Sequence, residues 1–257
     1  MKPLVSIHQA SLHLKLGKFV SRILNNISLD IFEGECLSLV GESGSGKTSL
    51  AHVLVGLTAL SSGKIVFHGD VHCEKNGNRG IQIIFQDIGG SLNPKMTVSE
   101  IILESLVIAG KIKENETYSR FREIMEIIEL PLSLRNAYPK ELSGGQKQRL
   151  SIGRGLISRP RLLICDEPLS SLDSIRQAHI MNVFRTIKKD LNITILFISH
   201  DLTAVHSLSD RIAVIHRGSL VEVATRDELF LNPRHYYTQE LLRMIPDFCY
   251  YDFSKVP

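Results

Sequence analysis

The chain has 257 residues, of which 43% are hydrophobic and 22% are charged, and its formal net charge is +3 at pH 7. This composition is typical of a folded globular protein and excludes a disordered chain. The longest apolar runs, such as residues 193–198, are far shorter than the roughly 20 residues that a membrane-spanning helix needs. The first residues form no apolar signal segment, and the scattered Lys and Arg residues form no nucleic-acid footprint. We therefore expect a soluble, cytoplasmic protein that does not bind nucleic acid.

The four cysteines, Cys36, Cys73, Cys165 and Cys249, form no C-x-x-C pair. Two of them lie inside apolar runs that read as strands, and we expect buried free thiols there. Free thiols fit a reducing compartment.

The first predicted elements are short β-strands. Residues 5–16 and 23–31 alternate apolar and polar side chains, as half-buried strands do. A turn at residues 32–35 precedes the apolar run 36–40, which feeds directly into a glycine-rich loop. Residues 48–56 then have the spacing of a buried helix that is closed by a glycine. A strand, a glycine-rich loop and a helix in this order are the context of a phosphate-binding loop.

Residues 41–48 read GESGSGKT and match the phosphate-loop pattern. Its glycines permit backbone conformations that aim successive N–H groups at phosphate oxygens, and the next helix adds its positive N-terminal end. Lys47 is expected to reach the β and γ phosphates, and Thr48 to supply a hydroxyl ligand for Mg²⁺. The alternative, a chance glycine-rich turn, is disfavoured by the flanking strand and helix. The predicted nucleotide-binding residues of this loop are Gly41, Glu42, Ser43, Gly44, Ser45, Gly46, Lys47 and Thr48.

The middle of the chain reads as helical. The apolar run 81–85 ends at Gln86, and residues 98–137 then have apolar side chains at helical spacings with no strand-like interruption. A further helix is predicted over residues 146–156, although Gly153 and Gly155 each cost up to ~1 kcal/mol of helix propensity within it. Close packing against a neighbouring strand would explain both glycines. We predict a helical insertion in this part of the chain.

Further along, residues 162–165 are apolar throughout, as in a strand that is covered on both faces. Asp166 and Glu167 then emerge at the end of a parallel strand where such sheets place ligands. Asp166 is expected to hold Mg²⁺, directly or through water. A capped turn into the next helix is the alternative, which the phosphate loop disfavours. The apolar runs 193–198 and 211–215, separated by helix-length segments, complete a predicted parallel sheet.

Three motifs occur in the order typical of one family. They are the phosphate loop, the sequence LSGGQ at residues 142–146, and the apolar run that ends in Asp166 and Glu167. The chain resembles the ATP-binding-cassette (ABC) ATPases. The resemblance implies an α/β fold: an ABC-type P-loop nucleotide-binding domain with an antiparallel β portion and a helical insertion. In a single domain over residues 1–257, we place the nucleotide-binding core at residues 1–87 and 159–257 and the helical subdomain at residues 88–158. ATP and Mg²⁺ are the implied ligands, and ATP hydrolysis is the implied activity.

The resemblance also assigns catalytic roles. Glu167 would position and polarise the attacking water. Gln86 would place an amide oxygen near Mg²⁺ and this water, and His200 would contact the γ-phosphate and the developing charge. The implied metal ligands are Thr48, Gln86 and Asp166.

A second group of residues is implied to bind ATP across a subunit interface. The loop before residue 147 has anion-binding geometry because it leads into a helix, and in the family it closes on ATP held by the partner's phosphate loop. Asp173 lies in the stretch through which one subunit senses the other. The aromatic residue that usually stacks on adenine is replaced by Leu14 or Leu16, and Phe19 is the nearest aromatic candidate. The loop residues are Ser143, Gly144, Gly145 and Gln146.

Two stretches narrow the resemblance. Residues 85–94 and 232–242 look like the importers of oligopeptides, dipeptides and nickel. Peptide-carrying members commonly continue into a longer tail with a cysteine cluster, whereas only Cys249 follows here, so we favour the short nickel or metal-chelate importers. Import of di- or oligopeptides is the alternative. A soluble non-transport ABC ATPase is a less favoured alternative, because such proteins have tandem cassettes, zinc modules or long coiled coils, and this sequence shows none of them. An exporter's ATPase is a third possibility.

The family pattern implies four kinds of interaction. We expect a second, different ATPase chain, two membrane permease subunits and an extracytoplasmic solute-binding protein. The chain would lie on the cytoplasmic face of the cell membrane, where the permeases dock near the glutamine loop and the helical insertion.

Overall fold

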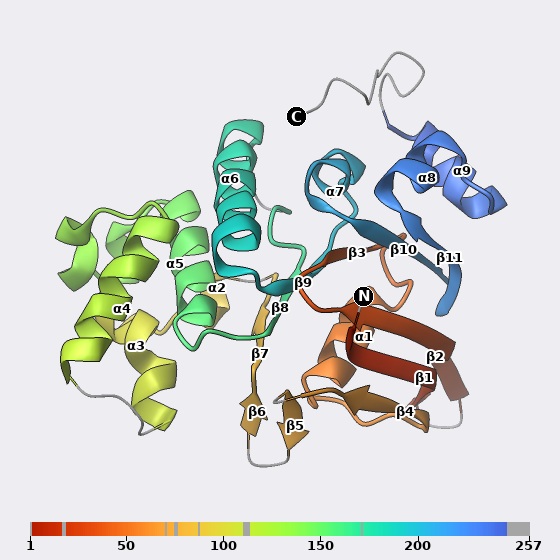
Figure 1. The fold of residues 1–257 in the computed structure, drawn as a ribbon, viewed down its shortest axis with the longest axis horizontal. Helices are drawn as coiled ribbons and strands as arrows, with labels where there is room; N and C mark the ends of the chain where they lie inside the picture. Colours follow the sequence, from red (N-terminus) through yellow and green to blue (C-terminus); the bar gives the residue numbers. More distant parts are fainter. Residues whose placement is uncertain are drawn as a thin grey trace.

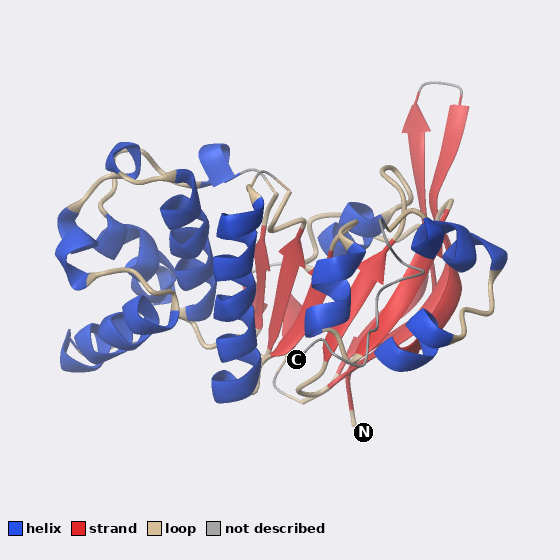
Figure 2. Cartoon of the chain, turned by 90° about the horizontal axis from the view of Figure 1, so that it is seen from above, coloured by secondary structure: helices blue, strands red, loops and turns tan. Residues whose placement is uncertain are grey.

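The computed structural model describes residues 2–16, 19–69, 71–74, 77–86, 88–109, 114–170 and 172–245. A bundle of helices and a part built on β-sheets lie side by side along the long axis (Figure 1). Seen from above, the strands form a band with the helical bundle at one end (Figure 2). Within the described ranges, no helix has both the length and the apolar character needed to cross a membrane.

The main sheet has six strands in the order β11-β10-β3-β9-β8-β7. Every neighbouring pair from β10 to β7 is parallel, and β11 returns antiparallel to β10. The strands β3, β8 and β9 are buried at every position, which is why they read as continuous apolar runs. The predicted parallel sheet is confirmed. Its strands are β3 (Cys36–Val40), β7 (Ile81–Ile84), β8 (Leu162–Asp166), β9 (Thr194–Ile198), β10 (Arg211–His216) and β11 (Ser219–Thr225).

Side chains of the central strands divide between two hydrophobic clusters. In β8, Leu163 and Cys165 belong to the cluster that includes the helical bundle, whereas Leu162 and Ile164 belong to the cluster on the opposite face. This division follows from the two-residue period of a strand. The cysteines Cys36 and Cys165 are buried free thiols, as predicted, while the side chains of Cys73 and Cys249 lie outside the part that the structure describes.

A second sheet, antiparallel throughout, has the order β2-β1-β4. The strands β1 (Pro3–Leu16) and β2 (Phe19–Phe32) have 14 residues each, so the expectation of short strands is wrong. Register shifts interrupt their pairing, and Gln9 and Asn26 have positive φ angles of 49° and 53°. Such bulges break the alternating pattern and make one long strand resemble shorter ones. The remaining strands are β4 (Ser62–Phe67), β5 (His72–Glu74) and β6 (Gly77–Arg79).

Helices occupy the stretch where the sequence predicts an insertion. The long helix α6 (Ser174–Leu191) lies between this bundle and the main sheet (Figure 1). The bundle consists of α2 (Ile88–Ser91), α3 (Val98–Ala109), α4 (Glu114–Ile127), the short 3-10 turns η1 (Leu132–Asn136) and η2 (Pro139–Glu141), and α5 (Gly144–Leu156). The other helices are α1 (Lys47–Leu54), α7 (Leu202–Leu208), α8 (Arg226–Leu231) and α9 (Tyr236–Arg243).

The two glycines of α5 have different neighbours. A Cβ atom at Gly155 would lie 3.4 Å from Leu163 Cδ1 and 3.6 Å from Ile84 Cγ1, so this glycine does face strand side chains. A Cβ atom at Gly153 would lie 2.7 Å from Ile128 Cδ1 and 3.1 Å from Ile124 Cγ2. Packing against a strand is therefore the wrong explanation for Gly153. Its close neighbours are α4 and the residue that follows that helix.

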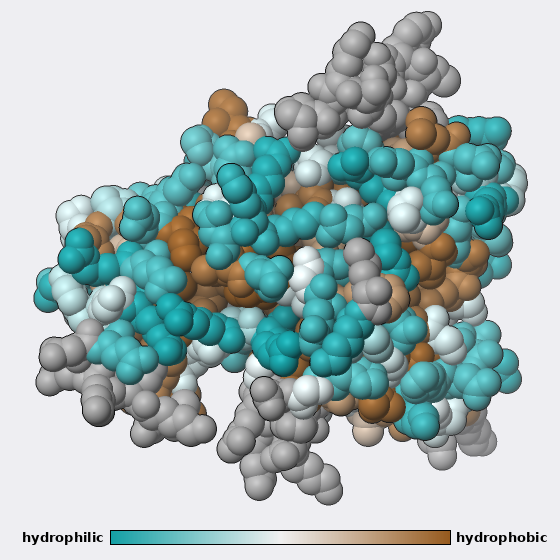
Figure 3. Space-filling model, in the orientation of Figure 1, coloured by the Kyte–Doolittle hydropathy of each residue, from teal (hydrophilic) through white to brown (hydrophobic). Residues whose placement is uncertain are grey.

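The face of the molecule shown in Figure 3 is largely hydrophilic, with hydrophobic areas in the middle and toward the β-sheet end. Elsewhere in the sequence, two neighbouring apolar side chains of α3 are strongly exposed, Val107 at 74% and Ile108 at 80%. The helical bundle thus presents apolar side chains to solvent.

Candidate functional site

The phosphate loop joins β3 to α1, as the sequence predicts. Gly41 and Gly46 have φ angles of 155° and 109°. A Cβ atom at Gly41 would lie 2.2 Å from the carbonyl oxygen of Ile215, and one at Gly46 would lie 2.8 Å from that of Ile23. Neighbouring backbone therefore wraps the loop so closely that these two positions require glycine.

Lys47, at the end of the loop, is buried, with 5% of its surface exposed. Its ammonium group donates to the carbonyl oxygens of Gly41 and Glu42, both at 2.8 Å. Burial lowers the pKa of Lys47, and the carboxylates of Glu167, Asp166 and Glu42 oppose this effect. The cation is thus held inside the loop and faces acidic groups.

Asp166 and Thr48 form the second part of the site. Asp166 is the last residue of β8 and is 2% exposed, and its Oδ1 accepts a hydrogen bond of 3.2 Å from the Thr48 hydroxyl. Burial raises the pKa of Asp166, and the hydrogen bond from Thr48 counteracts this. A hydroxyl and a carboxylate are oxygen ligands of the kind that Mg²⁺ prefers, so this pair fits the metal expected from the sequence.

Glu167 brings together the three side chains predicted to be catalytic. Its Oε2 lies 3.4 Å from Gln86 Nε2 and 3.3 Å from His200 Nδ1. The three residues follow β8, β7 and β9, which are adjacent parallel strands, so their carboxyl ends meet at one edge of the sheet. The backbone of Glu167 is left-handed, with φ 47°, a conformation that costs a non-glycine residue about 1 kcal/mol or more.

Lys47, Thr48 and the cluster of Glu167, Gln86 and His200 border one cavity of about 590 Å³, and Asp166 lies behind Thr48, to which it is hydrogen-bonded. The hydroxyl of Ser45, within the loop, is buried and finds no hydrogen-bond partner among the described residues. An unsatisfied buried hydroxyl in the loop, and a cavity lined by the oxygen-bearing side chains of Thr48, Gln86 and Glu167, fit an anionic ligand with a hard cation. The cavity is lined by Ile23, Ser43, Gly44, Gly46, Lys47, Thr48, Ser49, Gln86, Glu167 and His200.

The loop of residues 143–146 lies apart from this cavity. Ser143 caps α5. Its hydroxyl accepts a hydrogen bond of 3.3 Å from the backbone N–H of Gln146, and its own backbone N–H donates to Gln146 Oε1 at 2.8 Å. The neighbours of Gly144 and Gly145 include Arg176 of α6, which forms an ion pair of 3.2 Å with Asp173, the cap of that helix. The structure therefore brings the loop and Asp173 close to the same arginine. None of these residues lines the cavity at the phosphate loop.

Two contacts of the phosphate loop were missed from the sequence. Ile23 of β2 lines the cavity, and the hydroxyl of Tyr237 in α9 accepts a hydrogen bond of 3.0 Å from the Glu42 amide. Tyr237 does lie in the stretch 232–242, which the sequence analysis uses only as a family marker. Phe19 begins β2, but its side chain lies outside the described residues, so its stacking on adenine stays a prediction.

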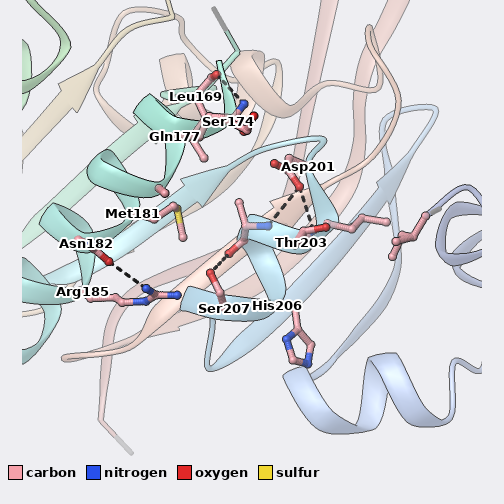
Figure 4. Close-up of a pocket in the computed structure, with 14 residues that line it drawn as sticks. Leu169, Ser174, Gln177, Met181, Asn182, Arg185, Asp201, Thr203, His206 and Ser207 are labelled. Atoms are coloured by element: carbon pink, nitrogen blue, oxygen red, sulfur yellow. Dashed lines mark hydrogen bonds between the residues drawn. The ribbon is translucent and has the colours of Figure 1, made fainter. Parts of the chain in front are cut away.

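A different cavity, of about 280 Å³, lies between α6 and α7 (Figure 4). Met181, Asn182 and Arg185 border it from α6, and Asp201, Thr203 and Ser207 from the region of α7. It shares no lining residue with the cavity at the phosphate loop. We assign the predicted ATP chemistry to the cavity at the phosphate loop.

Comparisons with known proteins agree on one family. A family model described as ABC transporter matches residues 24–170. The oligopeptide transport ATP-binding protein OppF of Lactococcus lactis is 42% identical over 240 residues, which cover 89% of this chain and 75% of that protein. OppF of Bacillus subtilis is 41% identical, covering 95% of this chain and 82% of its own, and a putative peptide import ATP-binding protein of Brucella ovis is 40% identical, covering 95% and 79%.

Solved structures show the same fold. CbiO1 of Clostridium perfringens, part of the ABC transporter complex CbiONQ, has a TM-score of 0.80 at 25% identity and covers 95% of this chain and 94% of its own. The dimeric cassette MJ0796 bound to ADP and Pi has a TM-score of 0.74 at 24% identity and covers 90% and 100%. The predicted ABC cassette fold, α/β with an antiparallel sheet and a helical insertion, is confirmed.

Proposed function

The chain belongs to the ABC transporter family, and from this premise we propose that it is the ATP-hydrolysing subunit of a peptide importer. It is an ABC-type transport ATPase that binds adenine nucleotides. The observation that supports the chemistry is the meeting of the phosphate loop and the cluster around Glu167 at one cavity, where Thr48 is hydrogen-bonded to Asp166.

Peptide as the cargo is supported by the relatives. Those described above are named for oligopeptide or peptide import and match along most of the chain, whereas none of them is named for nickel. The prediction of nickel rests on tail length alone, and the relatives favour its alternative, a di- or oligopeptide. The ATPase subunit does not itself touch the cargo. Tail length is therefore weaker evidence for the cargo than the names of relatives that match along most of the chain.

We propose separate tasks for the polar groups of this site. The loop amides and Lys47 bind the β and γ phosphates, and Thr48 and Asp166 hold Mg²⁺, directly or through water. The Gln86 amide nitrogen faces Glu167, which leaves its amide oxygen as a further ligand. Bound Mg²⁺ would neutralise charge on the phosphates. Glu167 orients and polarises the attacking water, and His200 stabilises charge that develops on the γ-phosphate.

The assembly we propose follows the family pattern. A second, different ATPase chain would complete each nucleotide site with the loop at residues 143–146. The nucleotide-binding core would comprise residues 1–87 and 159–257, and the helical unit residues 88–158. Two permeases would dock on the helical unit, where Val107 and Ile108 are exposed. CbiO1 is likewise part of a transporter complex. An extracytoplasmic solute-binding protein would deliver the peptide, and the chain would lie on the cytoplasmic face of the membrane.

The cargo is tested by uptake in cells that lack this gene. Radiolabelled dipeptide, tetrapeptide and nickel are supplied separately to the deletion strain, and the strain is complemented with the wild-type gene or with Glu167→Gln. We predict that deletion abolishes peptide uptake and leaves nickel uptake unchanged. Only the wild-type gene should restore peptide uptake. Lost nickel uptake beside normal peptide uptake would refute the peptide proposal and return the nickel interpretation.

A further inference from the structure

We infer that Tyr237, in the C-terminal helix α9, is a positioning residue that holds the first peptide plane of the phosphate loop. The inference rests on the proposed ATP-binding function. It extends the nucleotide site to an element far away in the sequence, because the bond between Glu42 and Tyr237 spans 195 positions.

The start of α9 is fastened to the main sheet. Glu222 of β11 accepts hydrogen bonds from the backbone N–H groups of Arg234 and His235, at 2.9 and 3.0 Å. The imidazole Nδ1 of His235 then accepts from the Tyr237 N–H at 3.1 Å and caps the helix. These bonds fix where α9 begins and therefore where the Tyr237 side chain leaves the backbone.

The Tyr237 side chain is buried against β10, the strand that pairs with β3. Its ring lies against that of His216 at the end of β10, with centroids 3.9 Å apart. Its hydroxyl accepts the 3.0 Å hydrogen bond from the Glu42 amide. Burial raises the pKa of Tyr237, so the hydroxyl stays protonated at neutral pH. The ring and the hydroxyl thus have separate contacts, which a substitution can separate.

The Glu42 amide and the Gly41 carbonyl belong to one peptide plane. The carbonyl accepts from Lys47 at 2.8 Å, and the amide on the opposite edge donates to Tyr237. The two bonds therefore hold one plane from both sides. This plane needs such support, because Gly41 has no side chain to restrict its rotation and its φ is 155°. Rotation of the plane would move the carbonyl that holds Lys47.

Loss of the Tyr237 hydroxyl should mainly weaken ATP binding. A loosened loop must be ordered again when it binds phosphates, and this ordering reduces affinity. Glu167, Gln86 and His200 follow other strands, so the hydrolytic step should change little. A change in KM with little change in kcat distinguishes positioning of the loop from a general loss of structure.

The test compares Tyr237→Phe with Tyr236→Phe in the full chain. The first variant keeps the ring against His216 and removes the hydrogen bond, and the second removes the same hydroxyl from a side chain that is 70% exposed. ATP affinity, by displacement of trinitrophenyl-ATP, and Tm are measured on the isolated full chain, and KM and kcat are measured on the assembled transporter. For Tyr237→Phe we expect ATP binding weakened roughly three- to tenfold and kcat within about twofold of wild type. Tyr236→Phe should match wild type.

Amide hydrogen exchange gives a second readout that does not depend on activity. In Tyr237→Phe the amides of residues 41–48 should exchange faster while those of α9 keep wild-type rates, even if Tm falls by a few degrees. Wild-type ATP affinity and loop exchange in Tyr237→Phe would overturn the inference. Failure of the wild-type chain to bind ATP would instead refute the proposed function.

Discussion

At the scale of the residue, Glu167 shows how local strain and long-range contacts define one chemical group. Its left-handed backbone turns the chain sharply at the end of β8, directly after Asp166. Gln86 and His200 then contact the same carboxylate oxygen from two sides. A carboxylate held in this way has a defined direction, which a base that acts on one water molecule needs.

The first residue-scale prediction concerns this carboxylate. Glu167→Gln removes the negative charge but keeps the size of the side chain, so ATP hydrolysis in the assembled complex should fall on the order of 100-fold or more. ATP affinity should change little because the phosphate loop and Lys47 are untouched. Steady-state hydrolysis and ATP binding measure the two effects separately.

Glu116→Gln is the matched control, because Glu116 is an exposed residue of α4 that pairs only with Arg120 in the described structure. It should hydrolyse ATP at the wild-type rate. Near-normal turnover of Glu167→Gln would remove Glu167 from its proposed role.

At the scale of the element, α5 illustrates how one helix satisfies two different surfaces. It begins at the capped loop of residues 143–146, packs against α4 near Gly153, and packs against β7 and β8 near Gly155. The same residue type therefore stands in two unlike environments within one turn. Helix propensity treats the two glycines alike, whereas packing does not.

We predict different stabilities for alanine substitutions at these two positions. Gly155→Ala meets only ordinary contacts, so the gain in helix propensity should raise the free energy of unfolding by up to ~1 kcal/mol. Gly153→Ala places a methyl group 2.7 Å from buried Ile128, so it should be less stable than Gly155→Ala by about 1–3 kcal/mol. Urea unfolding of both variants gives the comparison. Equal stabilities would show that α4 moves aside at little cost.

At the scale of the whole molecule, the helix N-termini predicted to bind phosphate are those of α1 and α5. The first opens into the cavity of the phosphate loop, and the second does not border it. A complete nucleotide site of the proposed kind therefore needs a second ATPase subunit. ATP would then bind between the two subunits.

The corresponding prediction uses Ser143→Arg. A bulky cation at this exposed loop should obstruct the approach of a partner's ATP site, so the assembled transporter should lose ATP-driven closure and transport by about tenfold or more. The isolated variant should bind ATP like wild type, because Ser143 lies outside its own cavity. Ser62→Arg, at an exposed position of β4 and outside the helical unit, is the control and should transport normally. Loss of ATP binding by isolated Ser143→Arg would contradict the shared site.

Several features of this protein depend on neighbouring residues and were predictable from the sequence. The phosphate loop between a strand and a helix, the acidic pair after an apolar strand, and the helical stretch before residue 157 are local patterns. Backbone freedom at glycine, the periodicity of apolar side chains and the chemistry of oxygen ligands act over a few residues. The family, the ABC cassette fold and the parallel sheet follow from these patterns.

Only the tertiary structure shows which distant residues meet. Strand order brings Gln86 and Glu167 together across 81 positions, and the packing of α9 brings Tyr237 to Glu42 across 195. Helix packing makes α4 the neighbour of Gly153, and bulges in the pairing of β1 with β2 hide the length of both strands from the sequence pattern. Local patterns could not establish these contacts, because strand pairing and helix packing minimise the free energy of the whole chain.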